Sequence, residues 1–266
     1  MAKITKQQSK MHIEAMALVK SDLPLSFDEI EFIFKHYNPM AQHMVGLAGI
    51  YFTPVSIARE MRIETMDLEN KRTLDLCAGI GILSYQAWKA HAMWNGTDNF
   101  EIVCIENNPE FVAIGKRIFP QAKWVCGDAF DRKTIEGLGK FDQVLSNPPY
   151  GIKIENNGWL EKGLSQYKAA EVAMKVSNHG IFILAQGDCP FKYSGINGFE
   201  RNDNNNKYKA FNKKTGIVIE MNCGIDISYA NNEWAGLGNN VQFEIAIISK
   251  EEFNHGESNL FSYQNQ

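Results

Sequence analysis

Four consecutive residues that follow an apolar run carry functional groups suited to binding and catalysis. The segment SNPPYG, residues 146–151, follows the run FDQVL and contains Asn147, Pro148, Pro149 and Tyr150. Proline has no backbone N–H for a strand ladder, so the pair should end a buried strand and expose carbonyl oxygens without competing donors. The Asn147 side-chain oxygen and the Pro148 carbonyl could then accept the two hydrogens of a planar amine, while Tyr150 offers a flat face for stacking.

Acidic residues and glycines recur at the expected ends of three earlier strands. The turn DLCAGIG places Asp75, Gly79 and Gly81 after the first strand, and the two glycines let the backbone approach a ligand closely. Glu106 ends the second strand, where a carboxylate can accept hydrogen bonds from ribose hydroxyls, and Asp128 ends the third, where it can bond an adenine amino group. Any one of these residues could simply serve a turn or a cap. Their shared place at one sheet edge indicates a nucleoside site.

The order of the expected elements indicates the fold. Apolar, β-branched runs alternate with amphipathic helices, which is typical of a parallel, doubly wound sheet. Because no helical run separates the last two strands, they should form an antiparallel pair at one edge. The expected strands are residues 72–78, 101–107, 122–128, 141–147, 180–186, 217–223 and 241–250. The expected helices are residues 81–92, 109–119 and 159–177, one that starts with Thr53 as N-cap and Pro54 as first residue, and helical structure within 10–48.

The chain divides into three parts. Residues 1–48 should form an N-terminal helical segment, residues 49–250 an α/β domain and residues 251–266 a flexible tail. Residues 187–215, rich in Gly, Asn, Lys and aromatic side chains, interrupt the alternation and are expected to form a long inserted loop.

Composition indicates an ordinary globular protein. The chain has 266 residues, of which 44% are hydrophobic and 22% charged. No apolar run is long enough to span a bilayer and the N-terminus lacks the apolar core of a signal peptide, so we expect a cytoplasmic protein. Five scattered cysteines should be reduced thiols, and six scattered histidines do not predict a metal site. A net charge of −4 argues against a simple nucleic-acid binder but allows a local basic patch.

Taken together, these motifs resemble those of S-adenosylmethionine-dependent methyltransferases. DLCAGIG is similar to their first motif, IEN around Glu106 to their second and GDAF around Asp128 to their third. SNPPY resembles the catalytic motif of amino-methyltransferases, above all the N6-adenine DNA methyltransferases, and YFTP at 51–54 resembles their FTP motif. The motif order is similar to the γ arrangement and to small orphan or phage-type enzymes. Over residues 49–250 the resemblance implies a Rossmann-like class I methyltransferase sheet, mostly parallel and seven-stranded with an antiparallel edge hairpin.

The resemblance also implies roles for the motif residues. The cofactor would be S-adenosyl-L-methionine, which carries its own leaving group, so no metal is expected. The residues implied to bind the cofactor are Tyr51, Phe52, Thr53, Pro54, Asp75, Ala78, Gly79, Gly81, Glu106, Asn107, Asp128, Ala129, Phe130 and Asn147. Those implied to act on the target amine are Asn147, Pro148, Pro149 and Tyr150.

The favoured target is adenine N6 in DNA, extruded from the duplex. Only sixteen residues follow the last expected strand, too few for the large recognition domain of a typical γ enzyme. DNA contact should therefore come from residues 187–215, from the N-terminal helices or from a partner subunit. Basic and aromatic residues alternate in that segment, which suits phosphate contact and base stacking, although a solvated surface loop explains them equally well. The candidates are Phe191, Tyr193, Lys207, Lys209, Lys213 and Lys214.

Other targets stay open from the sequence. Protein glutamine N5-methyltransferases also use NPPY on an amide nitrogen, and an adenine or guanine of structured RNA would present a similar amine. A cofactor-binding subunit without activity is a further alternative, against which the intact NPPY argues.

Overall fold

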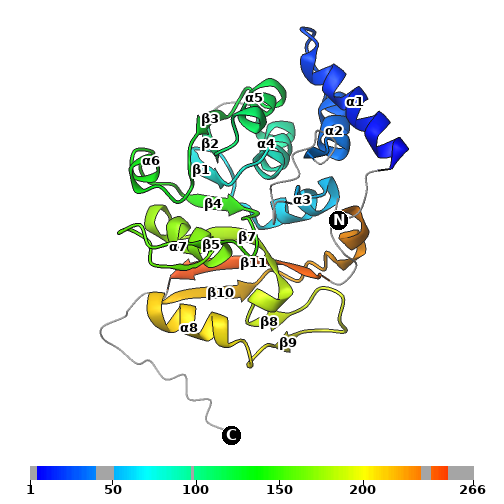
Figure 1. Ribbon diagram of the computed structural model, residues 1–266. Helices are drawn as coiled ribbons and strands as arrows, with labels where there is room; N and C mark the ends of the chain where they lie inside the picture. Colours follow the sequence, from blue (N-terminus) through cyan, green and yellow to red (C-terminus); the bar gives the residue numbers. More distant parts are fainter. Residues whose placement is uncertain (1–4, 40–50, 97–98, 235–240, 251–266) are drawn as a thin grey trace, which may run out of the picture.

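A seven-stranded sheet with helices on both faces forms the body of the protein (Figure 1). The computed structural model describes residues 5–39, 51–96, 99–234 and 241–250. The strand order in the sheet is β10-β11-β7-β4-β1-β2-β3. These strands are β1 (Lys71–Leu76), β2 (Phe100–Glu106), β3 (Lys123–Cys126), β4 (Gln143–Ser146), β7 (Gly180–Ala185), β10 (Ile217–Met221) and β11 (Phe243–Lys250).

Strand pairing confirms the expected topology. All neighbouring pairs from β3 to β7 are parallel, and β11 runs antiparallel to both β7 and β10. Along β2, Ile102 and Cys104 pack into one hydrophobic core and Val103 and Ile105 into the other. Because both faces of β2 are covered, the middle of this strand is a continuous apolar run, Ile102 to Ile105, without alternating polar residues.

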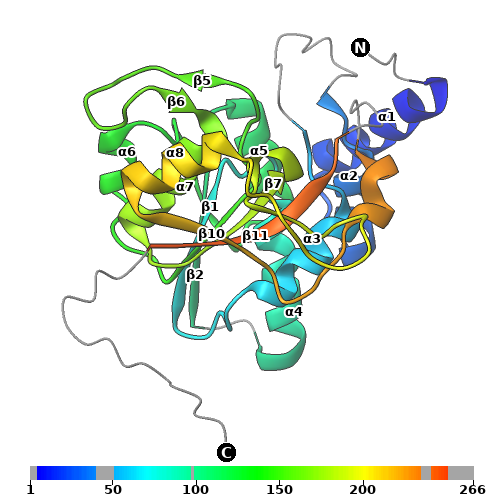
Figure 2. The same cartoon turned by 90° about the horizontal axis from the view of Figure 1, so that it is seen from below.

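Two groups of helices cover the two faces of the sheet. Figure 2 shows α1, α2 and α3 on one side and α6, α7 and α8 on the other, and α4 and α5 contribute to the same core as α3. The helices are α1 (Lys6–Lys20), α2 (Phe27–His36), α3 (Val55–Met61), α4 (Ile82–Asn95), α5 (Pro109–Ile118), α6 (Arg132–Glu136), α7 (Ser165–Val176) and α8 (Asn206–Thr215).

Local capping explains where two of these helices begin. Before α2, Ser26 Oγ accepts the Glu29 N–H and the Glu29 carboxylate accepts the Ser26 N–H, which is a complete capping box. Before α5, the Asn108 side chain accepts the Glu110 N–H at 2.9 Å, and Pro109 occupies the first helical position, where no N–H is needed.

Residues 187–215 do not form the long loop that was expected. They contain a small hairpin of β8 (Phe191–Lys192) and β9 (Glu200–Arg201), followed by α8. Asn205 caps this helix by accepting the Tyr208 N–H, and Gly216 ends it in a left-handed conformation with φ +66°. The run of asparagines suggested a loop, but it extends into the start of a helix, with Asn205 as the N-cap and Asn206 as the first helical residue.

The segment after NPPY also differs from expectation. A helix was expected from residue 159, but α7 begins six residues later because a second hairpin intervenes, made of β5 (Lys153–Ile154) and β6 (Gly163–Leu164). Helical structure within 10–48 is confirmed for α1 and α2. Residues 40–50, the boundary at 48/49 and the tail at 251–266 lie outside the described residues.

Candidate active site

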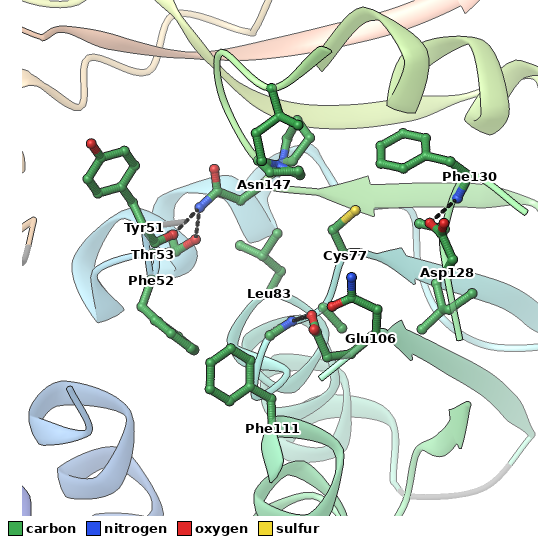
Figure 3. Close-up of a pocket in the computed structure, with 18 of the residues that line it drawn as sticks. Tyr51, Phe52, Thr53, Cys77, Leu83, Glu106, Phe111, Asp128, Phe130 and Asn147 are labelled. Atoms are coloured by element: carbon green, nitrogen blue, oxygen red, sulfur yellow. Dashed lines mark hydrogen bonds between the residues drawn. The ribbon is translucent and has the colours of Figure 1, made fainter. Parts of the chain in front are cut away.

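A cavity of about 530 Å³ lies at the carboxyl ends of the central strands (Figure 3). Its volume is within the roughly 300–1,000 Å³ that is usual for small-molecule sites. Most of the residues singled out in the sequence meet here, although Pro54, Asp75, Gly81 and Tyr150 are not part of the lining. The singled-out residues that do line it are Tyr51, Phe52, Thr53, Ala78, Gly79, Glu106, Asn107, Asp128, Ala129, Phe130, Asn147, Pro148 and Pro149.

The glycine turn after β1 forms one wall of the cavity. Gly79 has φ +57°, and a Cβ at this position would lie only 3.2 Å from the Phe52 ring. At Gly81, with φ +90°, a Cβ would lie 2.8 Å from the Trp124 ring. Packing beneath the turn therefore accounts for a glycine at position 81, and its expected place in the cofactor site stays a prediction. Only Gly79 keeps two walls of the cavity close together.

Asp75 lies beneath the glycine turn rather than in the cavity wall. Its side chain is 1% exposed, and its Oδ2 accepts the Ser84 N–H at 3.2 Å. Ser84 is the third residue of α4, whose N-cap Gly81 has no side chain to satisfy that donor. Asp75 thus takes over the capping role from the neighbouring strand, and its expected cofactor contact stays a prediction. Burial raises the pKa of Asp75 to about 6.

The raised pKa of Asp75 predicts a pH dependence of stability. A carboxyl group with a higher pKa in the folded chain favours folding when protonated, and this contribution is lost as the pH rises through the folded value. Between about pH 4 and pH 6, the free energy of unfolding of the wild type should fall by up to about 3 kcal/mol relative to that of Asp75→Asn. Denaturant unfolding of both proteins measures this difference, and parallel pH profiles would contradict it.

Glu106, at the end of β2, directs its carboxylate toward the glycine turn (Figure 3). Its Oε2 accepts the Gly79 N–H at 2.9 Å, and its Oε1 accepts the Asn108 N–H at 2.8 Å. Each oxygen keeps a further lone pair for a donor in the cavity. Burial raises the pKa of Glu106, and the backbone hydrogen bonds oppose this shift. The arrangement can accept hydrogen bonds from two neighbouring hydroxyl groups.

The wall after β3 is built from a loop and the β5–β6 hairpin. Asp128 Oδ1 accepts the Phe130 N–H at 2.8 Å, which fixes the loop, and Asn157 Nδ2 donates to the Phe130 carbonyl at 3.0 Å, which ties the hairpin to it. Ile152 and Ile154 also line the cavity. Sequence reasoning missed both isoleucines, because the hairpin strands have only two residues each and give no periodicity.

Hydrogen bonds fix the orientation of the Asn147 side chain (Figure 3). Its Nδ2 donates to the Tyr51 carbonyl and to Thr53 Oγ1, both at 2.9 Å. A carbonyl only accepts, so Tyr51 determines which end of the amide is nitrogen and leaves Oδ1 as an acceptor. Thr53 is not the helix cap that was expected, since its Oγ1 accepts from Asn147. The N-cap of α3 is Pro54, which has no side-chain hydrogen bond.

Tyr150 is turned inward, away from the stacking position suggested by the sequence. Its hydroxyl lies 2.6 Å from Asn147 Oδ1 and 2.6 Å from the Ile183 carbonyl, so one proton faces two acceptors. The ring packs against Phe243 with centroids 5.3 Å apart. Burial raises the pKa of Tyr150. A stacking role requires this side chain to turn outward.

The residues of 187–215 that were expected to contact a target lie outside the cavity lining. Phe191 is 2% exposed and packs into a core, so its expected stacking on a base is wrong for this structure. The Tyr193 hydroxyl donates to the Gly224 carbonyl at 3.2 Å. The four lysines are exposed along one helix, α8: Lys207, Lys209, Lys213 and Lys214.

The charges of the cavity restrict its ligand. Among the described residues that line it, Glu106 and Asp128 are the carboxylates, and none is Lys or Arg. A pyrophosphate would meet two carboxylates without a basic partner, whereas a sulfonium cation is attracted by them. Together with acceptors at two strand ends, this donor set fits S-adenosylmethionine.

In the described part of the chain, no group of three or more His, Cys, Asp or Glu side chains could hold a metal ion. No helix in those residues combines the length and apolar character of a membrane span. All five cysteines are free thiols.

Comparisons with known proteins agree with this site. The family model described as N-6 DNA methylase matches residues 28–186. No curated protein matches the sequence.

Solved structures share the fold. A modification subunit assigned to a type I restriction enzyme of Vibrio vulnificus aligns with TM-score 0.58 at 13% identity, over 86% of this chain and 51% of that one. The methyltransferase subunit of a type I restriction-modification system from Streptococcus thermophilus gives 0.53 at 14%, over 87% and 52%. A Listeria monocytogenes protein assigned to the class I S-adenosylmethionine-dependent methyltransferases gives 0.52 at 12%, over 96% and 92%. The expected class I methyltransferase fold is confirmed, and the chain spans about half the length of the two type I subunits.

Proposed function

We propose that this chain, which belongs to the N-6 DNA methylase family, transfers the methyl group of S-adenosylmethionine to the N6 amino group of adenine in DNA. The observation that carries the proposal is the fixed Asn147 amide at the end of β4, which borders the same cavity as Glu106 and Asp128. Acceptors for the amine and for the cofactor therefore share one cavity.

The acceptor pair suits a poor amine nucleophile. The lone pair of an aryl amino group is delocalised into the ring, so the nitrogen attacks weakly. Two acceptors on its hydrogens favour a pyramidal nitrogen and stabilise the positive charge that develops on it in the transition state. Asn147 Oδ1 and the Pro148 carbonyl would supply them, because the neighbouring proline has no N–H that competes.

Different residues of the cavity would bind different parts of the cofactor. When bound, S-adenosylmethionine supplies a methyl group already activated on a sulfonium. Glu106 would hold the ribose hydroxyls and Asp128 the adenine amino group. Thr53 Oγ1 accepts from Asn147 Nδ2, so its own proton remains available for the methionine carboxylate. Thr53 would thereby link the cofactor end of the cavity to the target end.

The target adenine would be extruded from duplex DNA into this site. We further propose that a partner subunit supplies sequence recognition. In support, this chain covers 51% and 52% of the Vibrio and Streptococcus proteins, which are described as subunits of larger enzymes. The free thiols are consistent with the reducing cytoplasm as its location.

A methyl-transfer assay tests the proposed function. The wild type would be incubated with labelled cofactor and, in parallel, with duplex DNA, structured RNA and a protein fraction. We expect label in DNA, and hydrolysis followed by chromatography should recover it as N6-methyladenine. Label in RNA or in protein glutamine, with none in DNA, would assign the enzyme to a different substrate class.

The exposed lysines of α8 are expected to contact phosphates. Replacing Lys207, Lys209, Lys213 and Lys214 with alanine should weaken DNA binding and reduce the slope of log affinity against log salt, by about 0.9 for each phosphate that the variant no longer neutralises. Cofactor affinity should not change, because α8 does not line the cavity.

A matched control removes the same charge elsewhere. Alanine at four other exposed lysines, Lys116, Lys123, Lys133 and Lys140, should leave the salt slope as in the wild type. Equal slopes for the wild type and the α8 variant would rule out α8 as the DNA contact.

A further inference from the structure

Behind the NPPY turn, α7 begins with a fully buried serine. Ser165 is 0% exposed, and its Oγ lies 2.6 Å from the Pro149 carbonyl, to which it donates. Its backbone N–H donates to the Ile152 carbonyl at 2.8 Å. Two hydrogen bonds from one residue therefore close the turn between Pro149 and Ile152. We propose that Ser165 is a positioning residue for methyl transfer, an inference that rests on the proposed function above.

The two bonds act on the turn that carries the Pro148 carbonyl, the proposed acceptor for the target amine. The pyrrolidine ring fixes φ of Pro149 but leaves its ψ to be set by the surroundings. The bond from Ser165 Oγ fixes the direction of the Pro149 carbonyl, and with it the plane of the next peptide. It also turns the Pro149 carbonyl toward a fully buried side chain, so we assign the Pro148 carbonyl as the acceptor for an amine beside Asn147. Ser165 thus fixes the peptide plane next to that acceptor.

The first turn of α7 is itself firmly anchored. Gln166, 2% exposed, donates from Nε2 to Asp188 Oδ2 at 2.8 Å, and the Tyr167 hydroxyl donates to the Asp188 carbonyl at 2.9 Å. Asp188 ends the short 3-10 turn Gln186–Asp188 that follows β7, the sheet neighbour of β4. The first turn of α7 is therefore held near β7 by bonds that do not involve the NPPY turn. Ser165 ties the NPPY turn to this fixed position.

The other end of α7 provides a matched comparison. Ser177 is also buried, at 6% exposed, and its Oγ donates to the Asp142 carbonyl at 3.0 Å, before β4 begins. Removing either hydroxyl eliminates a buried hydrogen bond between α7 and the chain around β4. Only Ser165 reaches the end of β4 that carries the acceptors, so the two serines separate positioning from ordinary stability.

The test compares Ser165→Ala, Ser165→Cys, Ser165→Thr and Ser177→Ala in the full chain. Steady-state DNA methylation gives kcat and KM, calorimetry gives cofactor affinity, and thermal unfolding gives stability. We expect Ser165→Ala and Ser165→Cys to lower kcat about tenfold, with KM and cofactor affinity unchanged, because only the transition state needs the acceptors aligned. Ser165→Thr keeps the donor and should restore turnover. Ser177→Ala should lose stability but keep kcat.

Amide hydrogen exchange over residues 150–153 adds a readout that does not depend on the substrate. Exchange should accelerate in Ser165→Ala and Ser165→Cys and stay at the wild-type rate in Ser177→Ala. The proposal is overturned if exchange in this segment is unchanged, or if wild-type turnover on DNA survives in Ser165→Ala. A wild type that methylates no DNA would instead refute the proposed function, and the exchange comparison would still decide whether Ser165 holds the turn.

Discussion

Replacement of Asn147 with alanine is expected to lower kcat for DNA methylation by a factor on the order of 10²–10³. In the proposed function its Oδ1 would be one of two preorganised acceptors at the nitrogen, and loss of one such group from a developing charge typically costs about 2.7–4 kcal/mol. Cofactor affinity should stay near that of the wild type, because the proposed contacts of the ribose and the adenine lie at Glu106 and Asp128. Single-turnover kinetics and calorimetry measure the two quantities separately.

Asn222 offers a matched control for this change. It is 4% exposed, and its Nδ2 also donates to two carbonyls, those of Ile225 and Ile245, but it does not line the cavity. Asn222→Ala should lower stability and leave turnover intact at a temperature at which the protein is folded. Turnover near the wild-type rate in Asn147→Ala, or equal losses in the two variants, would contradict the assigned role.

The cavity could be predicted largely because parallel strands place their carboxyl ends together. Glu106, Asp128 and Asn147 each lie at the carboxyl end of a parallel strand, so their positions at one edge follow from the topology. Gly81 shows the limit of that reasoning. A glycine indicates that something approaches the backbone closely, and at Gly81 the Trp124 ring already meets that requirement without any ligand.

Contacts between distant residues could not be predicted from the sequence. Thr53 resembled a local helix cap, whereas its hydroxyl accepts from Asn147, 94 residues further along the chain. The inward position of Tyr150 depends on the Ile183 carbonyl, which comes from a different strand. For α8, Phe211 is the buried residue of the helix, and one apolar position gives too weak a periodicity to outweigh the preceding asparagines.

Replacement of Glu106 with alanine should weaken cofactor binding by roughly 10- to 150-fold, corresponding to about 1.5–3 kcal/mol for hydrogen bonds to a charged acceptor. Glu106→Gln is expected to weaken binding as well, although it preserves the shape. Both carboxylate oxygens accept a backbone N–H, from Gly79 and Asn108, and an amide would place its own N–H₂ against one of these donors. Calorimetric titration of the cofactor measures both effects.

The pH dependence of cofactor binding adds a second signature of Glu106. The ionised carboxylate is the better acceptor, and its pKa is raised by burial, so affinity should fall on acidification at a pH above the usual range for glutamate. Asp131→Ala is the control, because that carboxylate caps α6 at the surface, three residues beyond Asp128, and its pKa is lowered by the Thr134 hydrogen bonds. Asp131→Ala should bind the cofactor like the wild type. Unchanged affinity in Glu106→Ala, or an equal loss in Asp131→Ala, would remove Glu106 from the ribose site.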